Sequence, residues 1–252
     1  MLGTDFMMGS PSWLDLAVPD TAGAAAFYGA VFGWVLQPTD GEDHGVLLKD
    51  GKAVAGLRTP IEAERAPGWT VYFQTPDADS TAVVTRDVGG EVREGPLDIA
   101  RTGRTAFLTD PTGTEFAVWE PEFLTGLEIA SEPDALAWLE LHTTDPASAE
   151  SFYRSLFGWR TSSATVGDVT RTVLATGAGD RDDVTFGAVV AAETDTRWTP
   201  LVAVADLAAS MTRIGDNGGI LRTDPVDDLP GTVVRVADPA GVGFGLVALR
   251  TD

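Results

Sequence analysis

The chain has 252 residues and a formal net charge of −21 at pH 7, from 38 acidic against 17 basic side chains. This charge repels nucleic acid and anionic membranes, so neither is an expected partner. The absence of cysteine excludes disulfides and thiolate sites, and two histidines are too few for a His-rich metal centre. We find neither a run of about 20 apolar residues nor an export signal at residues 1–10, so we expect a cytoplasmic protein.

The chain begins with the pattern of a strand followed by a helix. Residues 13–18 alternate with the period of a strand. Asp20 is a good N-cap for an alanine-rich helix over residues 21–32, which Gly33 ends. Three more strands separated by turn residues are expected at 34–37, 45–48 and 54–57. The first module is therefore predicted to be βαβββ.

The same order recurs from residue 69. A strand is expected at 69–74 and a helix at about 79–88. The remaining strands of this module are expected at 91–94, 105–109 and 115–119. Asp110-Pro111-Thr112-Gly113 suits the type I turn before the last strand.

The second half of the chain repeats the first. Residues 13–34 align with 138–159 at a constant offset of 125, without a gap and with 11 identities in 22 positions. Later matches extend the repeat to 68–70 with 197–199 and to 110–116 with 238–244. We therefore expect two domains, residues 1–126 and 127–252, joined within 121–134.

The repeated motifs resemble those of the vicinal oxygen chelate superfamily, which includes glyoxalase I, extradiol dioxygenases and bleomycin-resistance proteins. They are Asp20, Phe27-Tyr28 and Phe32-Gly33-Trp34, then Asp145, Phe152-Tyr153 and Phe157-Gly158-Trp159, and the two Asp-Pro-x-Gly turns. The chain is most similar to tandem two-domain actinobacterial members described as hydroxylase or glyoxalase-like. The resemblance implies an α+β fold of tandem glyoxalase/bleomycin-resistance-like domains, with four βαβββ modules forming cupped mixed sheets and helices outside.

The resemblance also implies where a divalent metal would be held in each cup. The matching positions are Trp13, Trp69 and Ala117 in the first half, and Trp138, Trp198 and Gly245 in the second. Indole nitrogen only donates, and alanine and glycine offer no ligand atom. We therefore expect no metal, and we do not expect glyoxalase or dioxygenase activity. Glycine-rich phosphate loops of the dinucleotide or nucleotide type are missing, so no other cofactor is expected.

Aromatic and acidic residues take the place of the ligands. Alternation along the strands, anchored on the ligand positions, predicts ligand-binding residues in both cups. They are Trp13, Asp15, Trp69, Phe73, Glu115 and Trp119 in the first half, and Trp138 and Trp198 in the second. The tryptophans could equally plug the cups as core. Glu140 and His142 share a face of one strand and are candidate catalytic residues, with a structural histidine as the alternative.

Three functions remain open. The first is a metal-free protein that sequesters a hydrophobic aromatic or polyketide-like metabolite, as bleomycin-resistance relatives sequester their drug. The second is a metal-free isomerase, cyclase or lyase that uses Glu140 and His142 as acid and base. The third is an interaction protein whose cups are filled by its own side chains. The expected partner is a small molecule, and the sequence leaves a homodimer open.

Overall fold

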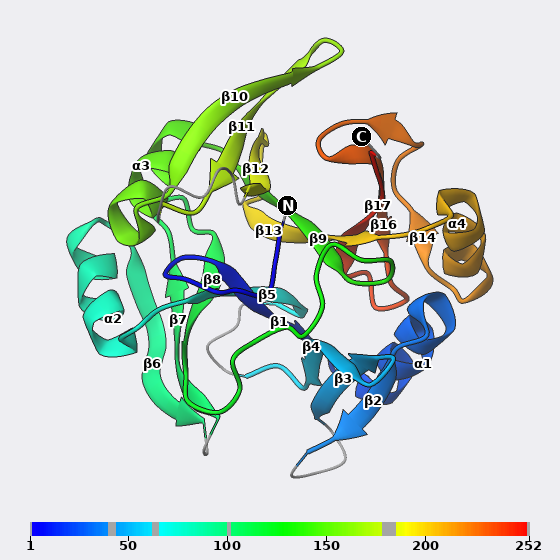
Figure 1. Cartoon of the computed structure of the whole chain (residues 1–252), viewed down its shortest axis with the longest axis horizontal. Coiled ribbons are helices and arrows are strands. Elements are labelled where there is room, and N and C mark those ends of the chain that lie inside the picture. Colours follow the sequence, from blue (N-terminus) through cyan, green and yellow to red (C-terminus); the bar gives the residue numbers. More distant parts are fainter. Residues whose placement is uncertain (1, 40–43, 62–65, 100–101, 178–184, 251–252) are drawn as a thin grey trace.

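The computed structural model describes residues 2–39, 44–61, 66–99, 102–177 and 185–250 (Figure 1). These residues form two mixed sheets, each taken from one half of the chain. The first sheet has the strand order β2-β3-β4-β1-β5-β8-β7-β6. The second has the order β10-β11-β12-β9-β13-β17-β16-β14, with β15 paired to β16. The two modules of each half therefore share one sheet, which confirms the tandem α+β fold.

The elements of the first half agree closely with the predicted ones. They are β1 (Pro11–Ala17), α1 (Thr21–Phe32), β2 (Val35–Pro38), β3 (Gly45–Lys49), β4 (Lys52–Arg58), β5 (Gly68–Gln74), α2 (Ala78–Asp87), β6 (Glu91–Ile99), β7 (Gly103–Thr109) and β8 (Glu115–Pro121). Most ends lie within one or two residues of the prediction, although β6 runs five residues further.

The second half repeats this order, except that two short strands take the place of β6. Its elements are β9 (Leu136–Thr143), α3 (Pro146–Phe157), β10 (Arg160–Val166), β11 (Val169–Ala175), β12 (Thr185–Ala191), β13 (Arg197–Ala203), α4 (Leu207–Asp216), β14 (Ile220–Leu221), β15 (Val226–Asp227), β16 (Gly231–Ala237) and β17 (Gly243–Leu249). No helix in the described ranges is long and apolar enough to cross a membrane.

The first helix of each half has the caps that the repeat predicts. The Asp20 side chain accepts from the Gly23 backbone at 2.9 Å, and Asp145 does the same for Ser148 at 3.1 Å. Gly33 ends α1 with φ of 71°, in the left-handed region that favours glycine. Both helices are thus fixed at their two ends by local sequence.

The register of β5 against β1 corrects one expectation. Trp13 lies opposite Tyr72, and Leu16 lies opposite Trp69. Residues opposite each other in an antiparallel pair point to the same face, so Tyr72 faces the cup with Trp13. Trp69 and Phe73 therefore point to the convex face, and the prediction that they face the cup was wrong.

The same correction applies to the second sheet. Trp198 lies opposite Leu141, whereas Thr199 lies opposite Glu140. Trp198 is therefore on the convex face, where its Nε1 donates to the Tyr153 hydroxyl at 3.0 Å. The cup-facing residue of β13 at this level is Thr199. The ligand positions assigned to β5 and β13 from the family were one residue out of register. A shift of one residue moves every side chain of a strand to the opposite face of the sheet.

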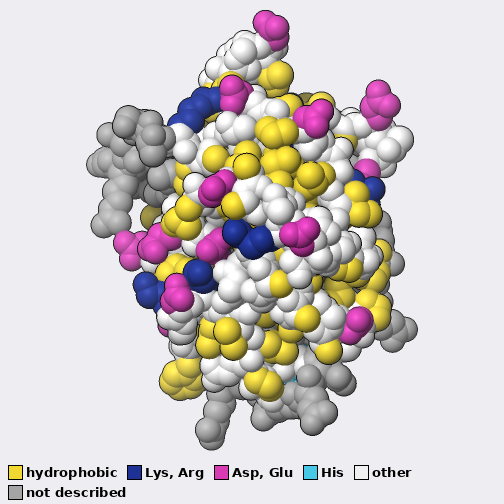
Figure 2. Space-filling model, turned by 90° about the vertical axis from the view of Figure 1, so that its right-hand side faces the viewer, with side chains coloured by type: hydrophobic (Ala, Val, Ile, Leu, Met, Phe, Trp, Pro, Cys, Tyr) yellow, Lys and Arg dark blue, Asp and Glu magenta, His cyan; other side chains and the backbone are white. Residues whose placement is uncertain are grey.

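The convex faces of the two sheets pack against each other. They meet along β5 and β13, with α1 beside α4 and α2 beside α3 (Figure 1). Phe73 lies at the centre, with ring centroids 5.0 Å from Trp159 and 5.2 Å from Trp198. This aromatic core makes the two halves one body and leaves the cups facing outward. Acidic side chains are dispersed over the face beside α1 and α4 (Figure 2).

Two buried tyrosines connect the halves reciprocally. Tyr28 on α1 donates to Asp238 Oδ2 at 3.2 Å, in the turn before β17. Tyr153 on α3 holds the equivalent position near Asp110, in the turn before β8, and its hydroxyl accepts from Trp198 Nε1 at 3.0 Å. Burial, and then the neighbouring carboxylate, raise the pKa of both hydroxyls well above the ordinary value, so both stay protonated. The recurring Phe-Tyr and Asp-Pro-x-Gly motifs thus build the interface between the halves.

We predict that Tyr28→Phe lowers the free energy of unfolding by about 1.5 kcal/mol, because it removes a buried hydrogen bond to a carboxylate. Tyr153→Phe should also destabilise the fold, because it removes the acceptor of the buried Trp198 Nε1, and the two effects should add because the sites are separate. Urea unfolding of the two variants and their combination measures this. Unchanged stability of the double variant would show that these two hydroxyls do not stabilise the fold.

Candidate functional site

The first cup is filled by its own side chains. Asp15 accepts hydrogen bonds from Trp13 Nε1 at 2.8 Å, Arg58 Nε at 2.9 Å and the Tyr72 hydroxyl at 2.8 Å. The Arg58 guanidinium lies 5.7 Å from the centroid of the Phe107 ring. Trp13, Tyr72 and Phe107 are all buried. This satisfied cluster fits the interpretation of Trp13 and Asp15 as structural.

The second cup holds a different polar network. Glu140 is 1% exposed, and Arg235 donates to both its oxygens, from Nε at 3.1 Å and from Nη2 at 2.6 Å. His142 Nε2 lies 3.0 Å from Glu140 Oε2. Arg171 pairs with buried Asp228 at 2.8 Å, and Arg235 Nη2 lies 3.8 Å from the same carboxylate. Glu140 and His142 lie together, as expected from their shared strand face. The network also contains Arg171, Asp228 and Arg235, which the sequence analysis did not identify.

The network keeps its carboxylates ionised. Burial alone would raise the pKa of Glu140, but the hydrogen bond with His142 and the charge of Arg235 outweigh it and lower this pKa below its ordinary value. For Asp228, the hydrogen bonds from Arg171 and the Leu229 backbone likewise outweigh burial and lower the pKa. Glu140 is therefore a clamped carboxylate that orients His142, and it is poorly suited to accept a proton itself.

These lowered pKa values predict a pH dependence of stability. A carboxylate with a lowered folded-state pKa stabilises the fold above its ordinary pKa of about 4.3, and this contribution is lost as pH falls through the folded value. The stability gap between the wild type and Glu140→Gln should therefore be widest near neutrality and narrow below about pH 4. Urea unfolding from pH 7 to pH 3 measures it. A gap that widened in acid would contradict the ion pair.

The other tryptophans of the cups are packed within the protein. Trp138 is 4% exposed and lies among apolar side chains of the second cup, including Val173 and Val247. Trp119 is 6% exposed, and its Nε1 donates to the Leu124 carbonyl at 2.8 Å.

A cleft of about 770 Å³ opens between the two halves. The first residues of four strands line this cleft, and they form two pairs that occupy equivalent positions in the two halves. They are Gly68 of β5, Glu115 of β8, Arg197 of β13 and Gly243 of β17. The lining also includes Trp69, Trp198, Thr199, Arg222, Arg235 and Phe244.

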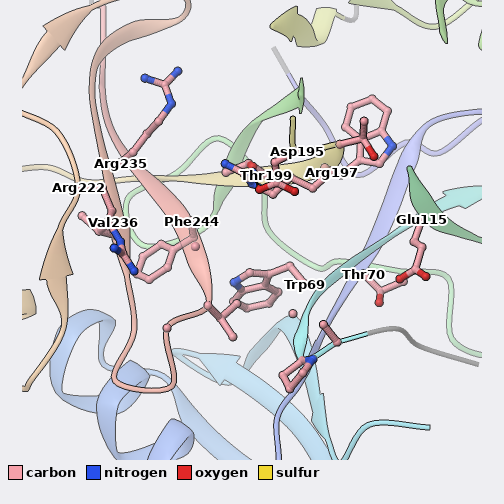
Figure 3. Close-up of a pocket in the computed structure, with 18 of the residues that line it drawn as sticks. Trp69, Thr70, Glu115, Asp195, Arg197, Thr199, Arg222, Arg235, Val236 and Phe244 are labelled. Carbon is pink, nitrogen blue, oxygen red and sulfur yellow. Dashed lines mark hydrogen bonds and ion pairs between the residues drawn. The ribbon is translucent and has the colours of Figure 1, made fainter. Parts of the chain in front are cut away.

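Figure 3 shows how the cleft is arranged. Trp69 lies in its middle and is half-buried, with Phe244 and Arg222 toward one side. Phe244 is 1% exposed and packs against Tyr28, with ring centroids 5.6 Å apart. Glu115 and Thr70 lie on the opposite side from Arg222. The structure thus brings three of the predicted ligand-binding residues to one place, and they come from both halves. These residues are Trp69, Glu115 and Trp198; the other five, Trp13, Asp15, Phe73, Trp119 and Trp138, are outside this lining.

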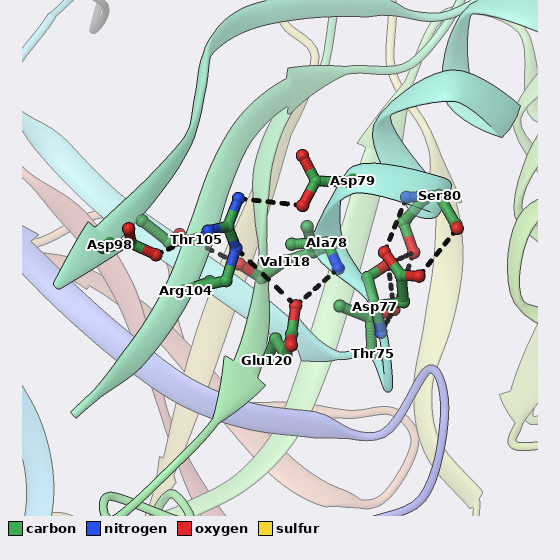
Figure 4. Close-up of polar contacts among 11 residues, drawn as sticks. Thr75, Asp77, Ala78, Asp79, Ser80, Asp98, Arg104, Thr105, Val118 and Glu120 are labelled. Carbon is green, nitrogen blue, oxygen red and sulfur yellow. Dashed lines mark hydrogen bonds and ion pairs between the residues drawn. The ribbon is translucent and has the colours of Figure 1, made fainter. Parts of the chain in front are cut away.

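A separate charge cluster holds the start of α2 to the first sheet (Figure 4). Arg104 donates to Asp98 at 2.6 Å and to Asp79 at 2.8 Å. Glu120 accepts from the Ala78 backbone at 2.9 Å, and Asp77 caps the helix through Ser80. The contacts of this cluster are to helix ends and neighbouring charges, so we assign it a structural role.

Comparison with known proteins identifies the family of this chain. The model of the glyoxalase-like domain family matches residues 13–119 and again 138–247. The chain belongs to this family. The anthracycline biosynthesis protein DauV of Streptomyces sp. (strain C5) is 35% identical, over 98% of this chain and 96% of the relative. The putative glyoxylase CFP32 of Mycobacterium tuberculosis (strain CDC 1551 / Oshkosh) is 29% identical, over 97% and 96%.

Solved structures confirm the vicinal oxygen chelate fold. The 2,3-dioxygenase LapB from Pseudomonas sp. KL28 superposes with a TM-score of 0.66 at 13% identity, covering 97% of this chain and 93% of the dioxygenase. The Mn(II)-bound glyoxalase from Novosphingobium aromaticivorans gives 0.65 at 14% identity, covering 96% and 83%. At these identities the likeness shows the fold and not the chemistry.

The residues of this chain do not fit a metal at the position that the fold implies. The described residues contain no group of three or more His, Asp or Glu side chains that could hold a metal ion. In the first cup, Trp13 Nε1 donates to Asp15, and Ala117 has no ligand atom. In the second cup, both oxygens of Glu140 already accept from Arg235. We therefore derive no metal-dependent step for this protein.

Proposed function

We propose that this protein of specialised metabolism binds a hydrophobic, aromatic polyketide-like metabolite in the cleft between its halves. The observation that carries the proposal is the 770 Å³ cleft, which has the half-buried Trp69 in its middle. Its volume lies within the range of about 300–1,000 Å³ that is typical of small-molecule sites. Planar aromatic side chains bind planar rings by offset stacking and by edge contacts. The relatives named for anthracycline biosynthesis support a polycyclic aromatic ligand.

A polar group in the cleft also lacks a partner. Thr199 is 4% exposed and lines the cleft, and its Oγ1 has no hydrogen-bond partner within the described residues. A buried hydroxyl without a partner costs about 1–3 kcal/mol. A ligand oxygen placed beside Thr199 would recover this energy, so the hydroxyl is suited to fix the ligand's orientation.

Equilibrium dialysis with daunomycinone, the uncharged aglycone of an anthracycline, tests the proposal. We expect the probe to accumulate on the protein side, to be recovered chemically unchanged by mass spectrometry, and to quench tryptophan fluorescence. Sequestration of this kind would protect a cell from a toxic aromatic compound. Neither accumulation nor quenching at micromolar protein would contradict binding of this ligand class.

A second function is favoured by the histidine of the second cup. Glu140 orients His142 through a 3.0 Å contact and is itself held by two hydrogen bonds from Arg235. A carboxylate-oriented imidazole is suited to proton transfer near neutral pH. A metal-free isomerase, cyclase or lyase would then use His142 as the proton carrier, with Glu140 as a positioning residue.

The probe incubation separates the two functions. Binding alone predicts that no product forms and that His142→Ala changes affinity by less than threefold. Catalysis predicts a new mass or isomer in the wild type that disappears in His142→Ala, while circular dichroism and the unfolding midpoint show a retained fold. Product formation that persisted in His142→Ala would exclude the histidine as the proton carrier.

A further inference from the structure

The cleft is built by a duplicated chain, yet its two walls differ in charge. Two pairs of equivalent strand positions in the lining carry the difference. They are Gly68 and Arg197, which begin β5 and β13, and Glu115 and Gly243, which begin β8 and β17. In each pair, the change makes the second-half wall more positive than the first-half wall, and Arg235 of β16 adds a further arginine to it. A symmetric duplication has therefore become a polarised site.

The arginines of the second-half wall are not equally available. Arg235 uses Nε and Nη2 for Glu140. Arg197 is paired with Asp195 through Nη1 alone, and its Nε and Nη2 make no hydrogen bond or ion pair with the described residues, so they can still bind a ligand. Arg222 is exposed, lines the cleft, and makes no side-chain hydrogen bond or ion pair with any described residue. Its backbone N–H is fixed by the Arg235 carbonyl at 2.7 Å, so its position on the wall is set by the sheet edge.

The concentration of arginine contrasts with the rest of the molecule. The chain has a net charge of −21, but the lining contains three arginines against two carboxylates, Glu115 and Asp195. A negatively charged ligand is repelled by most of this surface and is attracted to this wall. Guanidinium groups bind carboxylate and similar oxygens with paired hydrogen bonds, and they also stack on aromatic rings.

We propose that the ligand of the cleft is an anionic aromatic compound. Its ionised oxygen group, a carboxylate or a phenolate, is held by Arg222 and Arg197, while its rings lie against Trp69. This inference rests on the proposed binding function and adds the ligand's charge and orientation to it. Because the opposite wall carries Glu115, the ligand binds in one of the two orientations that a symmetric cleft would allow.

A matched pair of probes tests this inference. Anthraquinone-2-carboxylate is anionic, and anthraquinone-2-carboxamide has nearly the same shape without the charge. In titrations followed by tryptophan quenching, we expect the wild type to bind the carboxylate at least tenfold more tightly. Arg197→Gln/Arg222→Gln should reduce this preference to less than threefold with little change for the amide. Higher salt should also weaken carboxylate binding selectively.

Arg86→Gln is the control, because it removes one exposed arginine in the last turn of α2. It should leave the tenfold preference intact. Equal affinities for the two probes in the wild type, or a preference that survives in Arg197→Gln/Arg222→Gln, would overturn the inference while leaving aromatic binding in place. If neither probe bound, and daunomycinone did not bind either, the proposed function would fail and the inference with it.

Discussion

Gly243→Trp should weaken probe binding about a hundredfold without unfolding the protein, an effect of about 2.7 kcal/mol. Gly243 begins β17 in the wall of the cleft. Apart from its two chain neighbours, the nearest heavy atom to a Cβ added at this position would be the Val236 carbonyl oxygen, at 3.9 Å, and the backbone of Gly243 is not in the left-handed region. An indole can therefore be added without backbone strain, and it would occupy the space that a planar ligand needs. Probe titration and thermal unfolding measure the two effects.

Gly215→Trp is the matched control for this substitution. Gly215 lies in the last turn of α4, with no heavy atom within 4 Å of an added Cβ and an ordinary backbone angle. It is not among the residues of the cleft lining. The control should bind the probe as the wild type does. Full binding by Gly243→Trp would place the ligand elsewhere, and loss of binding in both variants would show a general effect of the added indole.

The order of the elements followed from local patterns in the sequence. Alternation, aspartate caps and glycine stops fixed α1 and its neighbours to within one or two residues, because these signals act between adjacent residues. The repeat then supplied the second half without separate argument. The pairing of modules within each half required the structure, since no local signal in the chain specifies which strands become neighbours.

The faces of β5 and β13 could not be fixed in this way. Trp69 was assigned to the cup through a family ligand position, whereas the observed register pairs Trp13 with Tyr72. A side chain changes face with each single-residue step, so a displacement of one residue reverses the result. The register depends on hydrogen bonds to a strand more than 50 residues away, and the sequence carries no direct record of them.

The candidate site was also only partly predictable from the sequence. Glu140 and His142 were predicted together because two residues of spacing in a strand place side chains on one face. Arg235 comes from β16, 95 residues further along the chain, and pairs with Glu140 only when the sheet is complete. Comparison of equivalent positions offered one signal, since Arg235 replaces Phe107 at a cup-facing position. The cleft itself arises where the two halves pack, so no single strand pattern could reveal it.

Each cup contains a carboxylate paired with an arginine, but the arginine comes from a different strand in each cup. Asp15 and Glu140 occupy equivalent positions on β1 and β9, but Asp15 is neutralised by Arg58 from β4 and Glu140 by Arg235 from β16. The acidic residue is therefore common to both cups, whereas the arginine that pairs with it comes from a different strand in each. In the first cup the arginine lies near Phe107 within a filled interior. In the second cup it stands in the wall of the cleft, where the charge can also act on a ligand.

Glu140→Leu should destabilise the protein by about 3 kcal/mol, because it leaves Arg235 largely buried without its main partner and removes the support of His142. The Glu140 and Arg235 side chains are 2% and 21% exposed, so water can compensate the arginine only in part. Urea unfolding at pH 7 measures the loss. Glu140→Leu/Arg235→Met replaces both charges by apolar groups among the apolar side chains of the second cup and should recover most of it. Equal destabilisation of both variants would mean that the shape of Glu140, and not its charge pair, supports the cup.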